Sequence, residues 1–363
     1  MNIADSESGT LDSDGARFAL RRLESLEALR PGWPELAERS GNVFATWEWL
    51  SAWWRHFGGG RELLAFRCER GDGSLAAILP LYVWRRRPRV LRFLGHGPGD
   101  ELGPVCAPEE RARTLEGLRR LLAGTRWSVF VGDQLSGEWR LAESLGARVL
   151  RREGSPVLEL NVPSWDDLLA TLSHGFRSQI RRDERNLLRD HGLVFRRTED
   201  PARLEQDLDL LFDLHRLRWP DSDAFAGTAE PFQRDFARTA FQLGWLRLWF
   251  LELEGRAHAA WYGLRFGGAD SFYQGGRDPA WQRPSLGITL VAHTIREAVA
   301  DGMSEYRFLR GGEGYKYRFS PRDAGLETIV LGRGPAGRAG VAALRLRFRR
   351  TDDDQPQGRF VST

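Results

Sequence analysis

Lysine is almost absent from this chain. Of its 53 basic residues, only Lys316 is not an arginine. An arginine-rich coding bias accounts for the shortage, but it leaves open whether the one lysine survives by accident or by function. Arginine offers a planar fork of donors and lysine a compact ammonium on a flexible stem, so the two cations are not equivalent at a specific site.

Cysteines and long apolar runs are also scarce. Neither Cys68 nor Cys106 has a partner at zinc-ligand or CxxC spacing, which excludes a disulfide framework or a cysteine metal site, and we expect no metal. The longest apolar run, Leu75 to Trp84, is about half a bilayer span and contains Pro80. The opening MNIADSESGTLDSDG lacks a signal-peptide pattern. We therefore expect a cytoplasmic protein without a transmembrane segment.

The charge balance limits the partners. The formal net charge is only +3, because 50 carboxylates offset the 53 basic residues. That balance excludes a strongly basic nucleic-acid coat, so we expect no DNA partner, although local anion sites remain open. A hydrophobic content of 41% predicts a globular protein, and 363 residues predict two domains.

Two hairpin patterns indicate two related lobes. Residues 63–84 are predicted as strand, Gly-Asp-Gly turn and strand, and residues 246–266 repeat this plan around Glu254-Gly255. We therefore predict two α/β lobes. The predicted division is a disordered tail at 1–16, an N-terminal lobe at 17–160, a C-terminal lobe at 161–335, and a basic helix with a disordered tail at 336–363.

The later part of the chain predicts a βαβ-like unit. A strand at 270–276, a helix at 285–302 and a strand at 304–311 follow one another. The predicted buried stripe of the helix consists of Ile288, Val291, Ala292, Ile295 and Val299. Thr289, His293 and Arg296 are therefore expected to face away from the core. The helix opens with Ser285, Leu286 and Gly287, and free N–H groups at such a start suit a pyrophosphate. The plainer alternative is that Ser285 only caps the helix.

A series of motifs then carries a family resemblance. SQIRRDERNLLRDHG, HRLRWP, GWLRLWFLELEGRAHAAWYGLRF, YQGGRDPAW, the Ser-Leu-Gly helix start and YRFLRGGEGYKYRF occur in this order. Over roughly residues 40–335 the chain resembles the CelD/BcsL-type, BioF2-like acetyltransferases of the GNAT superfamily, which are similar to the Fem-type (FemAB-like) aminoacyltransferases. The resemblance implies an α/β fold with mixed sheets in two tandem GNAT-like lobes, of which the first lacks a cofactor site.

The resemblance also implies a chemistry. The expected reaction is acyl transfer from acetyl-CoA, or another acyl-CoA, to an amine or sugar hydroxyl, with exopolysaccharide or cell-envelope synthesis as the setting and a peripheral association with that machinery. Two alternatives stay open: a Fem-like transferase that uses aminoacyl-tRNA, and a catalytically degenerate GNAT-fold binding subunit of a polysaccharide machine. The balanced charge and the lack of a long helical insertion disfavour a transfer RNA partner. Arg307 and Gly312 stand where the family often has acidic residues, which favours the degenerate alternative.

Acyl transfer to an amine needs a proton acceptor, because an alkyl amine with a pKa near 10 is neutral in only about one molecule per thousand at pH 7. Glu313, Asp278 and His258 are the predicted acceptors, and Tyr315 or Tyr273 the predicted acids for the leaving thiolate. For His258 a hydrogen-bonded core histidine is the competing interpretation, and for Arg181 it is a solvated helix face. His215 shares a helical face with Leu204, Leu208 and Leu211 and is predicted to be a core histidine. The predicted cofactor-binding residues are Ser285, Leu286, Gly287, Gly276 and Arg277, and the predicted substrate-binding residues are Lys316, Arg310, Arg218 and Arg181.

Overall fold

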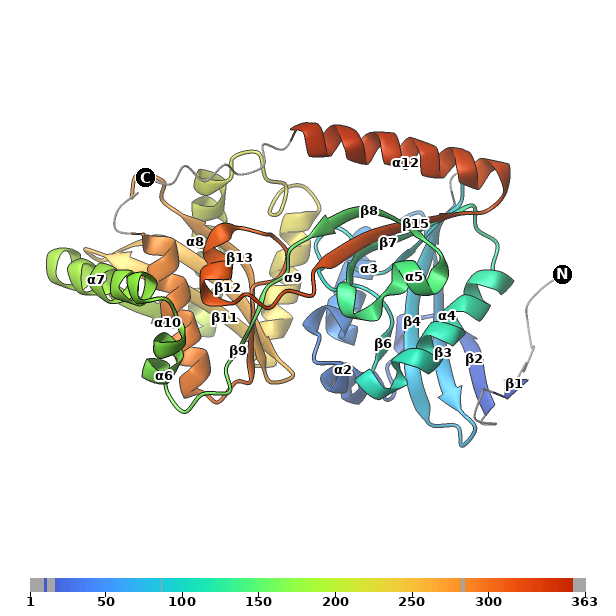
Figure 1. Cartoon of the computed structure of the whole chain (residues 1–363), viewed down its shortest axis with the longest axis horizontal. Helices are drawn as coiled ribbons and strands as arrows, with labels where there is room; N and C mark the ends of the chain where they lie inside the picture. The colour runs from blue at the N-terminus through green and yellow to red at the C-terminus, as the bar shows by residue number, and fades with distance from the viewer. Residues whose placement is uncertain (1–9, 12–16, 86, 282–284, 355–363) are drawn as a thin grey trace. The chain divides into compact units, whose positions relative to one another are not determined.

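The computed structural model of the 363-residue chain describes residues 10–11, 17–85, 87–281 and 285–354 (Figure 1). The chain forms two compact units. The N-terminal unit combines Met1–Glu153 with Ala324–Thr363, and the C-terminal unit is Gly154–Asp323.

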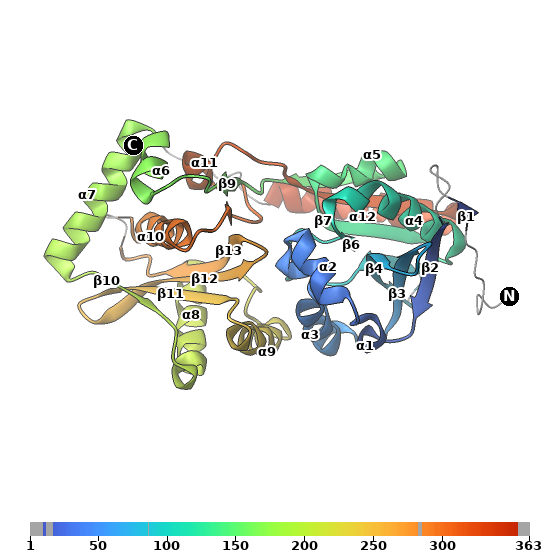
Figure 2. The same cartoon turned by 90° about the horizontal axis from the view of Figure 1, so that it is seen from below.

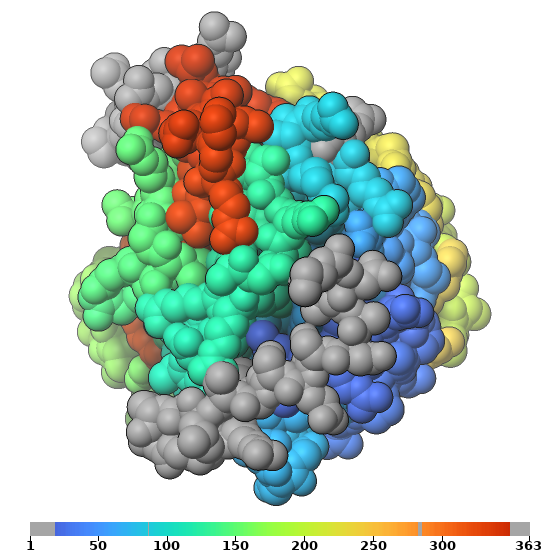
Figure 3. All heavy atoms as spheres, turned by 90° about the vertical axis from the view of Figure 1, so that its right-hand side faces the viewer, coloured from blue at the N-terminus to red at the C-terminus, as the bar shows by residue number. Residues whose placement is uncertain are grey.

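The N-terminal unit is a mixed sheet with helices on its faces. Its strands pair in the order β1-β2-β3-β4-β5-β7-β15-β8, and β6 pairs with β4. The strands are β1 Thr10–Leu11, β2 Arg17–Leu23, β3 Arg61–Arg70, β4 Leu75–Trp84, β5 Val90–Phe93, β6 Val105–Cys106, β7 Val129–Ser136, β8 Arg148–Glu153 and β15 Leu326–Gly332. The helices are α1 Leu26–Leu29, α2 Trp33–Ser40, α3 Trp47–Phe57, α4 Arg111–Gly124, α5 Leu141–Leu145 and α12 Gly334–Asp354. Val341 and Leu344 fix α12 to the sheet, and the helix lies along the surface of this unit (Figure 3).

The C-terminal unit is a second mixed sheet, in the order β10-β11-β12-β13-β14-β9. Its strands are β9 Val157–Glu159, β10 Val194–Arg197, β11 Leu246–Leu253, β12 Arg256–Phe266, β13 Ala269–Arg277 and β14 Glu305–Arg307. Its helices are α6 Trp165–Thr171, α7 His174–His191, α8 Leu204–Arg218, α9 Ala229–Gln242, α10 Leu286–Ala300 and α11 Gly314–Phe319. Helices α6, α7 and α10 lie on one face of the sheet and α8 and α9 on the other (Figure 2).

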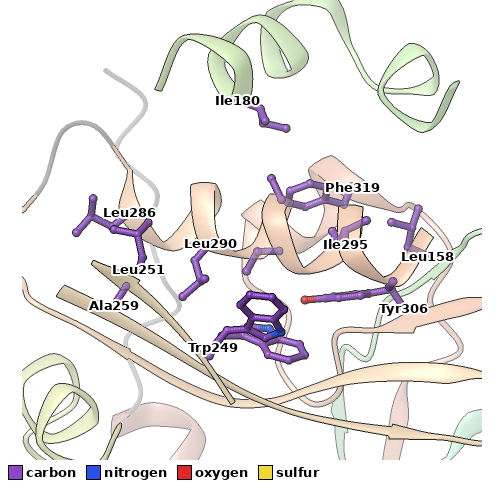
Figure 4. Close-up of a cluster of buried hydrophobic side chains, with 14 of the residues drawn as sticks. Leu158, Ile180, Trp249, Leu251, Ala259, Leu286, Leu290, Ile295, Tyr306 and Phe319 are labelled. Carbon is purple, nitrogen blue, oxygen red and sulfur yellow. The ribbon is translucent and has the colours of Figure 1, made fainter. Parts of the chain in front are cut away.

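Helix α10 is held by apolar burial. Leu286 and Ile295 are both fully buried in the core between α10, α7 and the sheet. Figure 4 shows Leu290 pointing from α10 toward Trp249 of β11, with Ile180 of α7 on the other side of the helix. Fully burying an aliphatic side chain of this size contributes about 1.5–3 kcal/mol, so the core fixes where α10 begins relative to β13.

The predicted hairpins and the βαβ-like unit are present. β3 and β4 pair around the first predicted turn, β11 and β12 around the second, and β13, α10 and β14 follow in the predicted order. Ser164 caps α6 by accepting a hydrogen bond from the Asp167 N–H. The α/β class with mixed sheets is therefore confirmed.

The lobe boundaries differ from the prediction. β15 was expected in the C-terminal lobe, but it pairs with β7 and β8 in the sheet of the N-terminal unit. β9 was expected in the N-terminal lobe, but it pairs with β14. Backbone pairing between distant segments decides both placements, and hydrophobic patterning along the chain carries no information about it. Of the predicted tail at 1–16, Thr10–Leu11 forms β1 and the remainder lies outside the described residues, as does 355–363.

The buried face of α10 is wider than predicted. Thr289 is 2% exposed and His293 is 9% exposed, although both were expected to face away from the core. The His293 ring stacks on Phe195 at 3.8 Å, and Arg296 donates a hydrogen bond to its Nδ1 at 2.9 Å. Burial first, and then the Arg296 charge, lower the pKa of His293 to about 3. The folded protein therefore holds this imidazole neutral.

The N-terminal unit repeats the strand plan of the C-terminal unit with one difference. β5 and β7 are parallel, like β13 and β14. After β5, however, the chain returns and Leu102 pairs with Leu135 of β7, before β6 joins β4. The backbone at Leu102 therefore pairs with β7. In the C-terminal unit the corresponding strands, β13 and β14, separate after Ser271.

Because β15 lies between β7 and β8, truncation after Asp323 is expected to unfold the N-terminal unit and leave the C-terminal unit protected. Hydrogen exchange followed by peptide mass spectrometry checks this, with truncation after Asp354 as the control. Protected β4 and β7 peptides in the shorter chain would contradict the placement of β15.

Neutral His293 predicts acid sensitivity. An unfolded histidine titrates near 6.5, so below that pH the unfolded state gains a proton that the folded state excludes, and stability falls as the pH falls from about 6.5 toward 3. The slope is about 1.4 kcal/mol per pH unit. His293→Gln is expected to flatten the pH dependence of the unfolding free energy by that amount, and exposed His174→Gln is the comparison variant. Equal slopes in both variants would refute the assignment.

Candidate active site

The two parallel strands of the C-terminal unit stay paired only briefly. β13 pairs with β14 from Ala269 to Ser271, opposite Glu305 to Arg307. β14 then ends, and β13 continues to Arg277 beside β12. Within the described part of the chain, residues 272–277 of β13 therefore have no strand on their β14 side. This open strand edge offers backbone N–H and C=O groups to an extended ligand.

A β-bulge lies within this open edge. Tyr262 pairs with Gln274 and Gly263 with Phe272, so Tyr273 is an extra residue in β13. A bulge redirects backbone groups and side chains out of the regular ladder. The Tyr273 hydroxyl accepts a hydrogen bond from Gln233 Nε2 at 2.6 Å, and the side chain is buried. Its predicted role as an acid has no support in this contact, because the hydroxyl is held inside the core.

The start of α10 is open to an incoming group. Ser285 occupies the N-cap position, but its side chain makes no capping hydrogen bond. Among the described residues, which leave out 282–284 just before this helix, a Cβ placed on Gly287 would meet only the Cδ of Arg277, at 3.8 Å. Ser285 therefore stands at the N-cap without the side-chain hydrogen bond that the capping alternative expects. The first-turn N–H groups and the positive end of the helix dipole lie beside Arg277, in an arrangement that suits phosphate oxygens.

Two arginines come together beside this helix start. Arg277 ends β13 and Arg218 ends α8. Burial first, and then the Arg218 charge, lower the pKa of the Arg277 guanidinium, while Asp278 acts in the opposite sense. Neither arginine forms a carboxylate ion pair among the described residues, and Arg218 stacks on Trp219, 4.3 Å from the ring centroid. The result is a local excess of positive charge that favours an anionic ligand.

Gly276 explains why the arginines meet. A Cβ on this residue would lie 2.3 Å from the backbone N of His215, so only glycine allows α8 to approach β13 this closely. His215 Nδ1 lies 2.9 Å from the Gly275 carbonyl oxygen. The predicted core role of His215 is confirmed, since this side chain is only 4% exposed. Gly276 thus contacts α8, and it acts on the site through packing.

His258 and Asp278 form a pair. His258 Nδ1 lies 3.2 Å from Asp278 Oδ2, and the Asp278 N–H donates to the His258 carbonyl oxygen at 2.8 Å. Both side chains are partly exposed, at 21% and 29%, so the predicted core alternative for His258 does not hold. The Trp281 ring lies 5.3 Å from the imidazole. The pair sits where β12 begins and β13 ends, beside Arg277.

Lys316 is buried beneath a turn. Its Nζ donates to the carbonyl oxygens of Arg310 at 2.8 Å and Gly311 at 3.2 Å, and it lies 2.9 Å from Glu313 Oε2. The turn contains Leu309 at φ +53°, a backbone conformation that is costly for a leucine. The ammonium therefore binds the protein's own turn, and we assign it a positioning role in place of the predicted contact with a ligand anion.

Tyr315 lies next to this turn and is packed against the apolar core of the unit. Burial first, and then the Glu313 carboxylate, raise the pKa of the Tyr315 phenol far above its usual range. The phenol therefore remains protonated at neutral pH. Glu313, Tyr315 and Lys316 form one group, and the His258–Asp278 pair forms a second, beside the start of α10.

Arg181 is not brought to either group. It pairs with Asp166 at 2.8 Å on the exposed surface of α7, with side-chain exposures of 55% and 80%. The solvated-face alternative is therefore the better description of this residue. Trp219 and Trp281 were not singled out from the sequence. For Trp219 the sequence offered one signal: this tryptophan directly precedes Pro220, where a helix is expected to end and a side chain can project into solvent.

Comparisons with known proteins agree with this architecture. Residues 174–317 match the family model described as an acetyltransferase (GNAT) domain. No curated protein matches the chain. The crystal structure of FemX superposes with a TM-score of 0.60 at 10% identity, covering 90% of this chain and 100% of that one. L-PGS from Bacillus licheniformis gives a TM-score of 0.53 at 14% identity, covering 90% and 96%.

A tandem GNAT protein from the clavulanic acid biosynthesis pathway gives a TM-score of 0.50 at 13% identity, covering 88% of this chain and 99% of that one. The predicted fold of two GNAT-like lobes is confirmed. The described residues contain no cluster of three or more His, Cys, Asp or Glu side chains able to hold a metal ion. No helix within them is long and apolar enough to cross a bilayer.

The position of Lys316 predicts a stability defect. Lys316→Met keeps the length of the stem but leaves the carbonyls of Arg310 and Gly311 without their donor, which is expected to cost about 1–3 kcal/mol. Lys316→Arg is also expected to destabilise, because a planar fork does not match converging carbonyls. Thermal unfolding checks both variants, with exposed Arg256→Met as the control. An unchanged melting temperature in Lys316→Met would reject the assignment.

Proposed function

We propose that the protein is an acyltransferase that takes an acetyl group, or another acyl group, from acyl-CoA and transfers it to the nitrogen or oxygen of a small acceptor. One observation carries the proposal: the open edge of β13 runs from the bulge at Tyr273 to the start of α10, where Arg277 and Arg218 gather. At about 3.3 Å per residue, the edge from Tyr273 to Arg277 is roughly 13 Å long, which suits an extended chain with a charged end.

The residues present fit CoA. The N–H groups of the first turn of α10 would hold the pyrophosphate, with Arg277 and Arg218 supplying the neutralising charge. Gly287 leaves space there, since a Cβ would meet a single atom of Arg277. Backbone groups of β13 beyond the end of β14 would pair with the amides of the pantetheine arm. When bound, CoA supplies the thioester, and the remaining chemistry belongs to this chain.

Two proton transfers are required. The acceptor must lose a proton, and the thiolate that leaves must gain one. Tyr315 is the proposed donor to the thiolate because it lies in the group with Glu313 and is protonated at neutral pH, although its raised pKa makes it a weaker acid than a free phenol. Glu313 is the proposed acceptor of the proton in the same group, held by Lys316 Nζ at 2.9 Å. The His258–Asp278 pair adjoins the proposed phosphate end, so we assign it to positioning Arg277 and the Trp281 segment.

The acceptor and the setting rest on the family resemblance. We propose an amine or sugar-type acceptor in exopolysaccharide or cell-envelope synthesis, as in CelD/BcsL-type enzymes, in the cytoplasm or peripherally at the envelope machinery. The likeness to FemX concerns the fold alone, so an aminoacyl-tRNA donor is retained as the competing outcome of the binding test below.

Gly287→Trp tests the donor site. The residue lies in the helix, and a Cβ there meets only one ordinary contact, so the bulky ring is expected to block the helix start without unfolding the protein. Calorimetric titration with acetyl-CoA is expected to give saturable binding that weakens at least tenfold in this variant. Gly175→Trp, in the first turn of α7 with nothing within 4 Å of its Cβ, is the matched control. A folded wild-type protein without acetyl-CoA binding would overturn the proposal in favour of another donor.

A further inference from the structure

An exposed tryptophan stands beside the proposed phosphate end of the site. Trp219 is 46% exposed, although tryptophan is usually largely buried. The ring is not left there by a frayed end. Its backbone N–H donates to His215 at 2.8 Å, its carbonyl accepts from Ser222 at 3.1 Å, and Ser222 Oγ lies 3.0 Å from His215 Nε2. The backbone of Trp219 is therefore fixed while the ring faces solvent.

The tryptophan belongs to a chain of contacts that reaches α10. The Arg218 guanidinium stacks on its ring at 4.3 Å, Arg218 perturbs Arg277 electrostatically, and Arg277 Cδ lies 3.8 Å from the Cβ position of Gly287. Gly276 brings α8 and β13 together at this point. An aromatic ring, two cations without carboxylate partners in the described part of the chain, and a helix start thus follow one another as successive neighbours.

These features match different parts of a nucleotide. Phosphates are bound by arginines and helix starts, whereas a base is bound by stacking on an aromatic face, which suits every base because each has a π surface. We propose that Trp219 stacks on the adenine of the acyl donor, so that the C-terminal unit recognises an adenosine 5′-diphosphate group. The inference rests on the proposed function, because it places the donor's phosphates at Arg277 and α10.

The shared chemistry is an adenosine, which terminates both CoA and transfer RNA. The test is calorimetric titration of the full chain with ADP, pyrophosphate, CoA and a short RNA that ends in CCA. ADP is expected to bind the wild type. Trp219→Ala is expected to weaken ADP binding by between about 5-fold and 100-fold, and Trp219→Phe to restore most of it, because a phenyl ring still stacks. Leu217→Ala, two residues away and also exposed, is the matched control.

Binding of pyrophosphate, which has no base, distinguishes two explanations for weaker ADP binding in Trp219→Ala: loss of stacking on the base, or displacement of Arg218. If the ring stacks on the base, Trp219→Ala binds pyrophosphate as the wild type does. An equal loss for ADP and pyrophosphate would overturn the inference, because Trp219 would then act only by holding Arg218. Normal ADP binding in Trp219→Ala, with loss in Gly287→Trp, would also overturn it and leave the donor site standing.

The two remaining outcomes concern the donor. If neither ADP nor CoA binds the folded wild type, the proposed donor site fails and the inference fails with it. If ADP binding depends on Trp219, the inference is supported, and the source of the adenosine is read from whether CoA or the CCA-ending RNA binds more tightly.

Discussion

The site depends on the short pairing of two parallel strands. β13 and β14 share a ladder only from Ala269 to Ser271, because β14 ends at Arg307. A longer ladder would satisfy the backbone groups of β13 and close its edge to a ligand. The parting of the strands keeps these groups available, and the apolar core under α10 holds the helix start at the far end of that edge. The proposed binding of an extended donor follows from both.

Many arginines of this molecule form ion pairs with nearby carboxylates. Arg234 contacts three carboxylates and Arg196 two. Arg218 and Arg277 belong to another set, which includes Arg247 and Arg318, for which no carboxylate ion pair forms in the described part of the chain. Two like charges brought together at a partly buried position are unfavourable unless an anion joins them. The Arg218 charge, which ranks after burial in lowering the pKa of Arg277, is consistent with the proposed anionic ligand.

The single lysine owes its place to geometry. Three donors on one compact ammonium can converge on the carbonyls of a tight turn, and the planar guanidinium of arginine cannot. That turn follows β14 and carries Glu313 and Arg310, so Lys316 acts on the site by fixing the backbone that presents them. The turn includes a leucine in the left-handed region, and the lysine hydrogen bonds offset part of that cost.

The sequence by itself determined the hairpins, the βαβ-like unit, the start of α10 at Ser285 and the core role of His215, because period, capping and turn chemistry are local properties. It also indicated the GNAT-like fold through its motifs. Only the tertiary structure placed β15 in the N-terminal unit, buried His293, turned Lys316 inward, and packed the end of α8 against Gly276 of β13. Each of these depends on pairing or packing between segments distant in the chain, and residue periodicity does not encode which distant surfaces meet.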